Sequence, residues 1–249
     1  MNLSNWISRS RSNPEAQLRL FCFPYAGGGA SAYRSWWERL PPSIELLAIQ
    51  PPGRENRLRE PTITHFSHFM AQLTEAIRPT LTMPFAFFGH SMGGLLCFEL
   101  ARQLRRQNLP QPVHLFISAF RAPQVPRRTD PIHDLPDPEF IAELRRLNGT
   151  PQQVYNEPEL LALLLPLLRH DFALVDDYRY AAEPPLAIPI SAFGGTADDE
   201  VTTDELKAWK DHTNSKFRLR MLPGDHFFLN TLQPLILRAI CQDLLPVLT

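Results

Sequence analysis

The stretch FAFFGHSMGGLLCFELARQLRRQ, residues 85–107, decides the fold. Its first four residues are apolar and read as a buried strand, and from Ser91 onward apolar residues recur at three- and four-residue steps, as on an amphipathic helix. Between the two lies the pattern G-x-S-x-G, formed by Gly89, Ser91 and Gly93. So sharp a turn needs small residues on either side of the serine and holds the serine in a strained conformation. The stretch therefore predicts a strand, a tight turn that exposes a serine, and a helix.

Short apolar runs and amphipathic stretches alternate along the rest of the chain. Strands are expected at residues 18–23, 44–49, 85–88, 113–118, 188–193 and 217–222, and helices at residues 64–77, 91–107, 202–212 and 226–245. This alternation is typical of a mainly parallel sheet flanked by helices. Together with the G-x-S-x-G turn, which matches a nucleophile elbow, it predicts an α/β-hydrolase fold with Ser91 as nucleophile. The 249 residues suit one domain, 1–249.

One connection is much longer than a crossover helix requires, since roughly 70 residues separate the strands expected at 113–118 and 188–193. It begins with a proline-rich stretch and continues with helical pieces at 141–147, 158–170 and 171–178. We interpret residues 121–185 as an inserted helical lid, because leucine-rich segments in such a place suit the apolar cover of a substrate channel. The alternative is a helical subdomain with no such role.

Charge and cysteine content exclude several classes of protein. The net charge is −1, from 25 basic and 26 acidic residues, which favours neither nucleic acid nor an anionic membrane as a partner. Three distant cysteines, Cys22, Cys97 and Cys241, lack metal-ligand spacing and are expected to be buried thiols. Residues 1–17 read as a polar lead-in and not as a secretory signal, and the apolar run 160–168 is too short to cross a bilayer. A cytoplasmic protein without metal or cofactor is expected.

A serine nucleophile needs a base within hydrogen-bond reach, and the base needs a third group to orient it. Five histidines follow Ser91, and His226 alone comes just after an expected strand, where a loop brings it to the carboxyl edge of the sheet. In α/β hydrolases the acid lies between serine and histidine in the chain. The loop after the strand at 188–193 contains two adjacent candidates, Asp198 and Asp199, which the pattern does not separate. A capping box at residues 202–205 starts the next helix and bounds this loop.

Five motifs together resemble the type II (external) thioesterases that accompany nonribosomal peptide synthetases and polyketide synthases. They are FPYAGGGASAYRSW, QPPGRENR, GHSMGG, GGTADDEV and PGDHFFL, which appear in the order typical of the family. The resemblance covers essentially the whole chain after the lead-in. The resemblance implies an α/β-hydrolase fold and a Ser91, Asp198 and His226 triad. It assigns the acid to Asp198, puts Asp199 in a variable position and leaves Asp225 outside the triad.

The tetrahedral intermediate of such a reaction needs two N–H donors. One comes from the residue after the nucleophile, Met92, and the other from the loop after an early strand. The glycine-rich loop at residues 24–31 suits this second donor, and the resemblance assigns it to Ala26. The substrate is expected beside Tyr25, Gly27, His90 and Phe227.

The resemblance also implies the reaction, which is hydrolysis of acyl or aminoacyl thioesters from the phosphopantetheine arm of carrier proteins. Stalled or wrongly primed carriers are the expected substrates, and a monomer the expected state. Arginine pairs at 105–106, 127–128 and 145–146 are read as solvated surface or as a docking site for an acidic carrier protein. Two other functions stay open: a small-molecule esterase or lipase, and a non-catalytic binding protein of the same fold.

Overall fold

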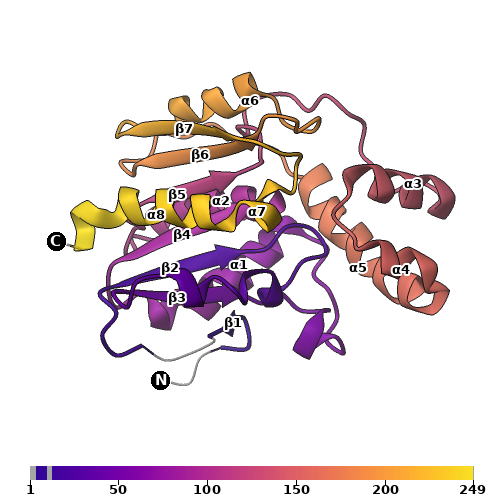
Figure 1. The fold of residues 1–249 in the computed structure, drawn as a ribbon, viewed down its shortest axis with the longest axis horizontal. Coiled ribbons are helices and arrows are strands. Elements are labelled where there is room, and N and C mark those ends of the chain that lie inside the picture. Colours follow the sequence, from indigo (N-terminus) through magenta and orange to yellow (C-terminus); the bar gives the residue numbers. More distant parts are fainter. Residues whose placement is uncertain (1–3, 10–12, 249) are drawn as a thin grey trace.

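A computed structural model describes residues 4–9 and 13–248. Among these residues one sheet of seven strands runs through the molecule, with helices on both faces (Figure 1). The strand order is β1-β3-β2-β4-β5-β6-β7. Only the pairing of β1 with β3 is antiparallel, and the other five pairings are parallel. The α/β-hydrolase expectation of a mainly parallel sheet is therefore confirmed.

The expected strands are all present, some with shifted ends. Their bounds are β2 Leu18–Phe23, β3 Ile44–Ile49, β4 Phe85–His90, β5 Leu115–Ser118, β6 Ile190–Gly195 and β7 Phe217–Leu222. Strand β6 runs two residues beyond the expected end because its two final glycines still pair with β7. A side chain at Gly195 would meet the backbone of Gly224 and Asp225, so glycine allows the turn after β7 to approach.

The first strand corrects the interpretation of residues 1–17 as a polar lead-in. Residues 1–3 and 10–12 of that segment lie outside the described residues, but β1, Ile7–Ser8, pairs with the outer edge of β3. Trp6 and Ile7 are buried, and the Trp6 ring packs edge-on against Phe69 at 5.2 Å between centroids. Two residues are too few for a period-two pattern to reveal a strand.

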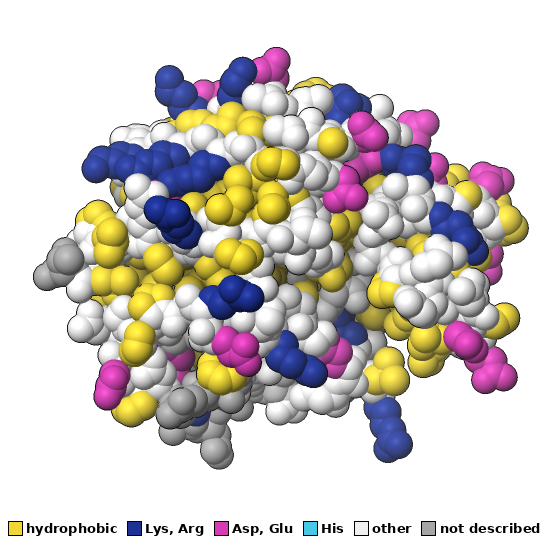
Figure 2. Space-filling view, in the orientation of Figure 1, with side chains coloured by type: hydrophobic (Ala, Val, Ile, Leu, Met, Phe, Trp, Pro, Cys, Tyr) yellow, Lys and Arg dark blue, Asp and Glu magenta, His cyan; other side chains and the backbone are white. Residues whose placement is uncertain are grey.

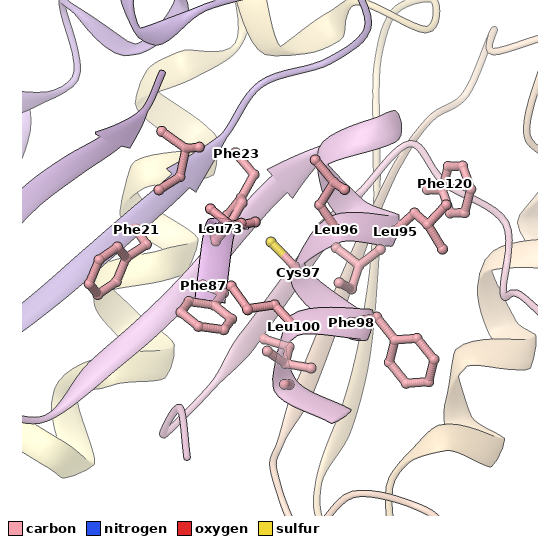
Figure 3. Packing of buried hydrophobic residues seen from close by; sticks show 14 of the residues in the cluster. Phe21, Phe23, Leu73, Phe87, Leu95, Leu96, Cys97, Phe98, Leu100 and Phe120 are labelled. Atoms are coloured by element: carbon pink, nitrogen blue, oxygen red, sulfur yellow. The ribbon is translucent and has the colours of Figure 1, made fainter. Parts of the chain in front are cut away.

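Alternating side chains of the strands build a core on each face of the sheet. One core joins Phe21, Phe23 and Phe87 to helices α1, Phe66–Ile77, and α2, Met92–Arg106. Figure 3 shows side chains of α2, among them Leu96 and Leu100, facing these phenylalanines. The opposite core contains alternate strand residues and the apolar side of α8, Gln233–Leu248.

Two expected helices are divided. Residues 202–212 form α6, Thr203–Lys207, followed by a 3₁₀ turn, and residues 226–245 form α7, Phe228–Thr231, and then α8. Pro234 lies in the first turn of α8, where its missing N–H costs no helical hydrogen bond. A proline in this position favours the start of a new helix. The expected capping box is present, because Thr202 and Glu205 accept hydrogen bonds from each other's backbone N–H.

Helices α3, Asp137–Leu147, α4, Gln152–Asn156, and α5, Pro158–Asp176, occupy the long connection between β5 and β6. They stand beside the carboxyl edge of the sheet as a separate lobe, at the right of Figure 1. Figure 2 shows hydrophobic side chains on the surface of this lobe, and Leu163 is 54% exposed. The two helical pieces expected at 158–178 are one helix that continues through Pro166.

No helix in the described part of the chain is long and apolar enough to cross a membrane. Cys22 and Cys97 are buried in β2 and α2, and Cys241 is half-buried. Burial raises the pKa of the Cys22 and Cys97 thiols well above the usual value.

Candidate active site

Ser91 lies on the turn between β4 and α2, and its backbone has the strained conformation that the sequence predicts. Its φ is +52° and its ψ is −123°, values that few residues other than glycine adopt. A side chain at Gly89 would collide with the backbone of Gly93, and one at Gly93 with the carbonyl oxygen of Phe23. Both glycines of the motif are thus required by close backbone approach.

A chain of hydrogen bonds connects Ser91 to the other two residues of the expected triad. His226 follows β7, and its Nε2 lies 3.1 Å from the Ser91 Oγ. Its Nδ1 lies 3.0 Å from Oδ2 and 3.2 Å from Oδ1 of Asp198, which follows β6. The Asp198 carboxylate is fully buried, and the N–H groups of Glu200 and Val201 donate to its Oδ1 at 2.8 and 3.2 Å. All three residues follow parallel strands, whose carboxyl ends share one edge of the sheet.

The two other acids near His226 have different neighbours. Asp199 is exposed, and its backbone carbonyl oxygen accepts a hydrogen bond from Arg128. Asp225 is also exposed and accepts the N–H of Phe227 at 2.9 Å, which stabilises the turn before α7. The structure therefore brings Asp198 to His226 and leaves Asp199 and Asp225 outside this hydrogen-bond chain.

His90 lies behind His226 and is fully buried. Its Nδ1 is 2.9 Å from the Ser118 Oγ, and its ring is 5.4 Å from that of His226. Burial, and secondarily the neighbouring His226, lowers the pKa of His90 well below its ordinary value. A neutral ring is suited to support His226 without competing for a proton.

The hydroxyl of Ser91 opens into a pocket between the sheet edge and the insertion. Met92, Ala26, Tyr25 and Phe227 line it together with Ser91 and His226. The rings of Tyr25 and Phe227 lie edge-on at 5.0 Å between centroids. The insertion adds apolar residues, which are Leu144, Leu147, Leu168, Phe172 and Val175. Gly27 lines a second, adjoining pocket, which shares Tyr25, Ala26 and Leu168 with the first. Of the expected pocket residues, His90 is in neither lining.

Three arginines of the expected pairs line the first pocket, and each is paired with an acid. Arg127 contacts Asp176, Arg128 donates to Glu205 at 3.0 Å, and Arg146 contacts Glu200. In the other pairs, Arg105 and Arg106 both bind Glu183, while the Arg145 guanidinium lies over the Tyr155 ring. The arginine doublets therefore serve contacts within the chain.

Sequence reasoning missed Arg54 and Asp171, which form a buried ion pair beside the glycine-rich loop. Arg54 lies in the PGRE motif at residues 52–55, and this motif could have marked Arg54 as a functional residue. Asp171 had no such signal, because an acid on a leucine-rich helix reads as a solvated residue.

The comparisons with known proteins agree with the fold described above. A family profile described as "Thioesterase domain" matches residues 18–244. The gramicidin S biosynthesis protein GrsT of Aneurinibacillus migulanus is 46% identical over 99% of this chain and 96% of its own. The structure of BorB, a type II thioesterase from the borrelidin biosynthetic cluster, has a TM-score of 0.88 and 37% identity, covering 97% of this chain and 98% of that one.

A second solved structure is similar to the same degree. It is RedJ, a thioesterase from the prodiginine biosynthetic pathway in Streptomyces coelicolor, with a TM-score of 0.86 and 38% identity over 92% of this chain and 91% of its own. Identity of this extent over nearly the full length, together with the family profile, confirms the resemblance found in the sequence. The chain belongs to the thioesterase family and is a hydrolase of the α/β-hydrolase fold, grouped with the type II thioesterases.

Proposed function

We propose that this enzyme hydrolyses acyl and aminoacyl thioesters from the phosphopantetheine arm of carrier proteins in nonribosomal peptide or polyketide synthesis. The observation that carries the proposal is the hydrogen-bond chain from Ser91 through His226 to Asp198, which opens into a pocket beneath the insertion. Names of similar proteins support the pathway class, since GrsT acts in gramicidin S biosynthesis and BorB belongs to a borrelidin cluster.

In the first half of the reaction, the Ser91 Oγ attacks the thioester carbonyl carbon while His226 Nε2 takes the hydroxyl proton. Asp198 keeps the Nδ1 proton of His226 in place and stabilises the imidazolium that forms. When the tetrahedral intermediate collapses, the carbon–sulfur bond breaks and His226 gives its proton to the departing thiolate. The products are an acyl ester on Ser91 and the free phosphopantetheine thiol.

In the second half, water replaces the thiol. His226 takes a proton from the water, whose oxygen attacks the acyl-Ser91 carbonyl, and then returns a proton to the Ser91 oxygen as the carboxylic acid departs. Apart from water and substrate, only groups of this chain take part in these steps, so we propose that neither a metal nor a cofactor is needed.

The negative charge on the tetrahedral oxygen is held by the N–H groups of Met92 and Ala26. Met92 is the first residue of α2, where N–H groups lack helical acceptors and the helix dipole favours an anion. Ala26 lies in the loop after β2, and both residues line the pocket that contains Ser91. Tyr25 and Phe227 form the apolar wall beside the acyl group.

We propose that the biological task is the release of stalled or wrongly primed acyl groups from carriers. The insertion at residues 121–185 acts as the lid, and the phosphopantetheine arm enters between it and the sheet. The enzyme works as a monomer in the cytoplasm, with the carrier protein as its partner and without a role for nucleic acid or membrane.

The test is to offer an acylated carrier protein to the wild type and to Ser91→Ala, and to follow the carrier mass. Wild type is expected to return the carrier to its free-thiol mass, and Ser91→Ala to leave it loaded. A p-nitrophenyl ester of the same acyl group, assayed in parallel, separates a thioesterase from a simple esterase. If the wild type cleaves the ester rapidly and leaves the carrier loaded, the proposal is wrong.

A further inference from the structure

The loop that carries the Ala26 N–H forms a tight turn. The Gly28 N–H donates to the Tyr25 carbonyl oxygen at 2.9 Å, and Gly27 has a φ of +78°. A hydrogen bond from the fourth residue to the first, with positive φ at the third, is typical of a type II turn. The Tyr25 carbonyl and the Ala26 N–H belong to one peptide plane. The direction of the Ala26 N–H is therefore fixed by the geometry of this turn.

Asp171 holds the centre of that turn from outside the loop. Its Oδ2 accepts the Gly27 N–H at 2.7 Å. Type I and type II turns differ by a flip of the central peptide, which exchanges the position of this N–H with that of the Ala26 carbonyl oxygen and leaves the Tyr25–Ala26 peptide in place. A carboxylate attracts an N–H and repels a carbonyl oxygen, so Asp171 favours the turn that is observed.

Arg54 fixes the position of the Asp171 carboxylate. Its Nη1 donates to Oδ2 at 2.7 Å and its Nη2 to Oδ1 at 2.8 Å, which is a two-pronged ion pair. The same Nη1 donates to the Gly28 carbonyl oxygen at 2.9 Å. Arg54 and Asp171 are 4% and 2% exposed, so water does not screen the pair. The turn is thus held at Gly27 and at Gly28.

The next residue of the PGRE motif holds the other end of the glycine-rich loop. The Glu55 Oε1 accepts hydrogen bonds from the Ser31 N–H at 3.2 Å and the Ser31 Oγ at 2.6 Å. Glu55 has a φ of +49°, an uncommon backbone conformation for a residue other than glycine. A strained residue that makes hydrogen bonds to the glycine-rich loop indicates that the PGRE motif shapes this loop.

Asp171 belongs to α5, so the turn is also joined to the insertion. Leu168, one turn earlier on α5, packs closely on Gly27. A Cβ atom at Gly27 would lie 2.5 Å from the Leu168 Cδ2. Leu168 is part of the small core of the insertion, while Leu174, further along α5, is part of the main core. Helix α5 therefore connects the lobe, the turn and the body of the enzyme.

We infer that Asp171, held by Arg54, is a positioning residue: it fixes the place of the turn at Tyr25–Gly28, and with it the Tyr25–Ala26 peptide whose N–H is aimed at the tetrahedral oxygen. It rests on the proposed function, in which Ala26 is an oxyanion donor. Asp171 touches neither substrate nor Ser91 in this arrangement. The position of α5 is thereby linked to the oxyanion site.

The rival explanation is that the ion pair only stabilises the fold, and two variants separate the explanations. Asp171→Asn keeps an oxygen that accepts the Gly27 N–H but leaves the buried Arg54 charge without a counter-charge. The double variant Arg54→Met with Asp171→Leu leaves no unpaired charge but removes the acceptor. Replacing a buried ion pair by apolar residues is often neutral for stability, whereas breaking one is strongly destabilising.

The two variants are expected to rank in opposite order for thermal stability and for activity. Asp171→Asn is expected to lower the thermal midpoint and to keep kcat within about fivefold of wild type. The double variant is expected to keep a thermal midpoint near that of wild type and to lose about 10- to 100-fold in kcat, with KM changed less than threefold. The upper bound is set by removal of one oxyanion donor, which costs about 10²- to 10³-fold. The kcat and KM of both variants are measured with the same acylated carrier protein.

Asp243→Asn is the matched control. Asp243 is an aspartate with a fully buried side chain that accepts two hydrogen bonds of 2.8 Å from Arg220, and it lines neither of the two pockets. It is expected to lower the thermal midpoint while kcat stays at the wild-type value. If the double variant recovers both stability and kcat, or if kcat follows the thermal midpoint in every variant, the inference is wrong.

Two additions keep the test decisive. If the double variant does not fold, Asp171→Glu replaces it, because glutamate keeps the charge opposite Arg54 but displaces the carboxylate from Gly27; a wild-type kcat in that variant overturns the inference. Ser91→Ala, assayed alongside, separates the two proposals. Turnover by Ser91→Ala refutes the proposed function, whereas an inactive Ser91→Ala with a double variant of wild-type kcat refutes only the role of Asp171.

Discussion

Asp198→Asn is the sharpest test of the hydrogen-bond chain, because the structure predicts how asparagine would be oriented. The Asp198 Oδ1 accepts the N–H groups of Glu200 and Val201, so the asparagine oxygen is expected to stay there. The amide NH₂ then faces His226 Nδ1 and donates to it. This moves the imidazole proton to Nε2, which faces the Ser91 Oγ at 3.1 Å. A histidine in that tautomer cannot accept the serine proton.

The size of the loss follows from this change of tautomer. The same replacement in a Ser-His-Asp triad lowers kcat by about 10⁴-fold, which corresponds to about 5.5 kcal/mol in the activation free energy. Asp199→Asn is the matched control, since it makes the same chemical change in the adjacent, exposed residue. We expect less than a threefold change in kcat for that variant.

The assay is single-turnover release of the acyl group from a loaded carrier protein, with thermal unfolding followed by circular dichroism. Both variants are expected to unfold within a few degrees of wild type, since asparagine keeps the shape of aspartate. A large loss of kcat in Asp199→Asn with little loss in Asp198→Asn would refute the assignment of the acid. A loss below tenfold in both would refute the tautomer argument.

Two other predictions concern the fold around the site. Gly93→Ala is expected to prevent folding or to lower the thermal midpoint by more than 10 °C, because its new methyl group would collide with the Phe23 carbonyl oxygen. The control Gly94→Ala, whose new methyl group would meet side chains at 3.1 Å, should fold with a smaller loss. Equal thermal midpoints in the two variants would contradict this. Burial lowers the pKa of His114 from 6.5 to about 4, so the unfolded chain binds its proton more tightly and stability is lost as pH falls from about 6.5 to about 4. The loss from His114 is about 3 kcal/mol, and urea unfolding of wild type and His114→Gln at pH 7, 5 and 4 should show a shallower decline in the variant.

The sequence allowed much of the sheet to be predicted because parallel strands are short, apolar and separated by turns. Strands β2, β3 and β7 have the expected bounds. Ser91 and His226 could be located as well, since their positions depend on strand order and on a local motif. The residue pattern could not decide Asp198 against Asp199, because both lie in one loop. The family resemblance selected Asp198, and in the structure it is Asp198 that makes hydrogen bonds to His226, Glu200 and Val201.

The parts that escaped prediction depend on distant contacts. Asp171 and Arg54 are 117 residues apart, and neither local pattern indicates that the other balances its charge. Strand β1 is two residues long and exists because β3 offers it an edge. The sequence pattern divides helix α5 between residues 170 and 171, yet packing against both the insertion and the main core keeps it continuous.

The distance along the chain between the members of the hydrogen-bond chain also bears on how the protein acquires its activity. Ser91 and His226 are 135 residues apart in sequence, and β5, the insertion, β6 and β7 lie between them. Closing a loop of that length is entropically costly, and contacts of high sequence separation form slowly. Ser91 therefore meets its base only after β6 and β7 have joined the sheet. During refolding from urea, enzymatic activity is expected to recover later than helical circular dichroism, so turnover can serve as a reporter of the last strand pairings.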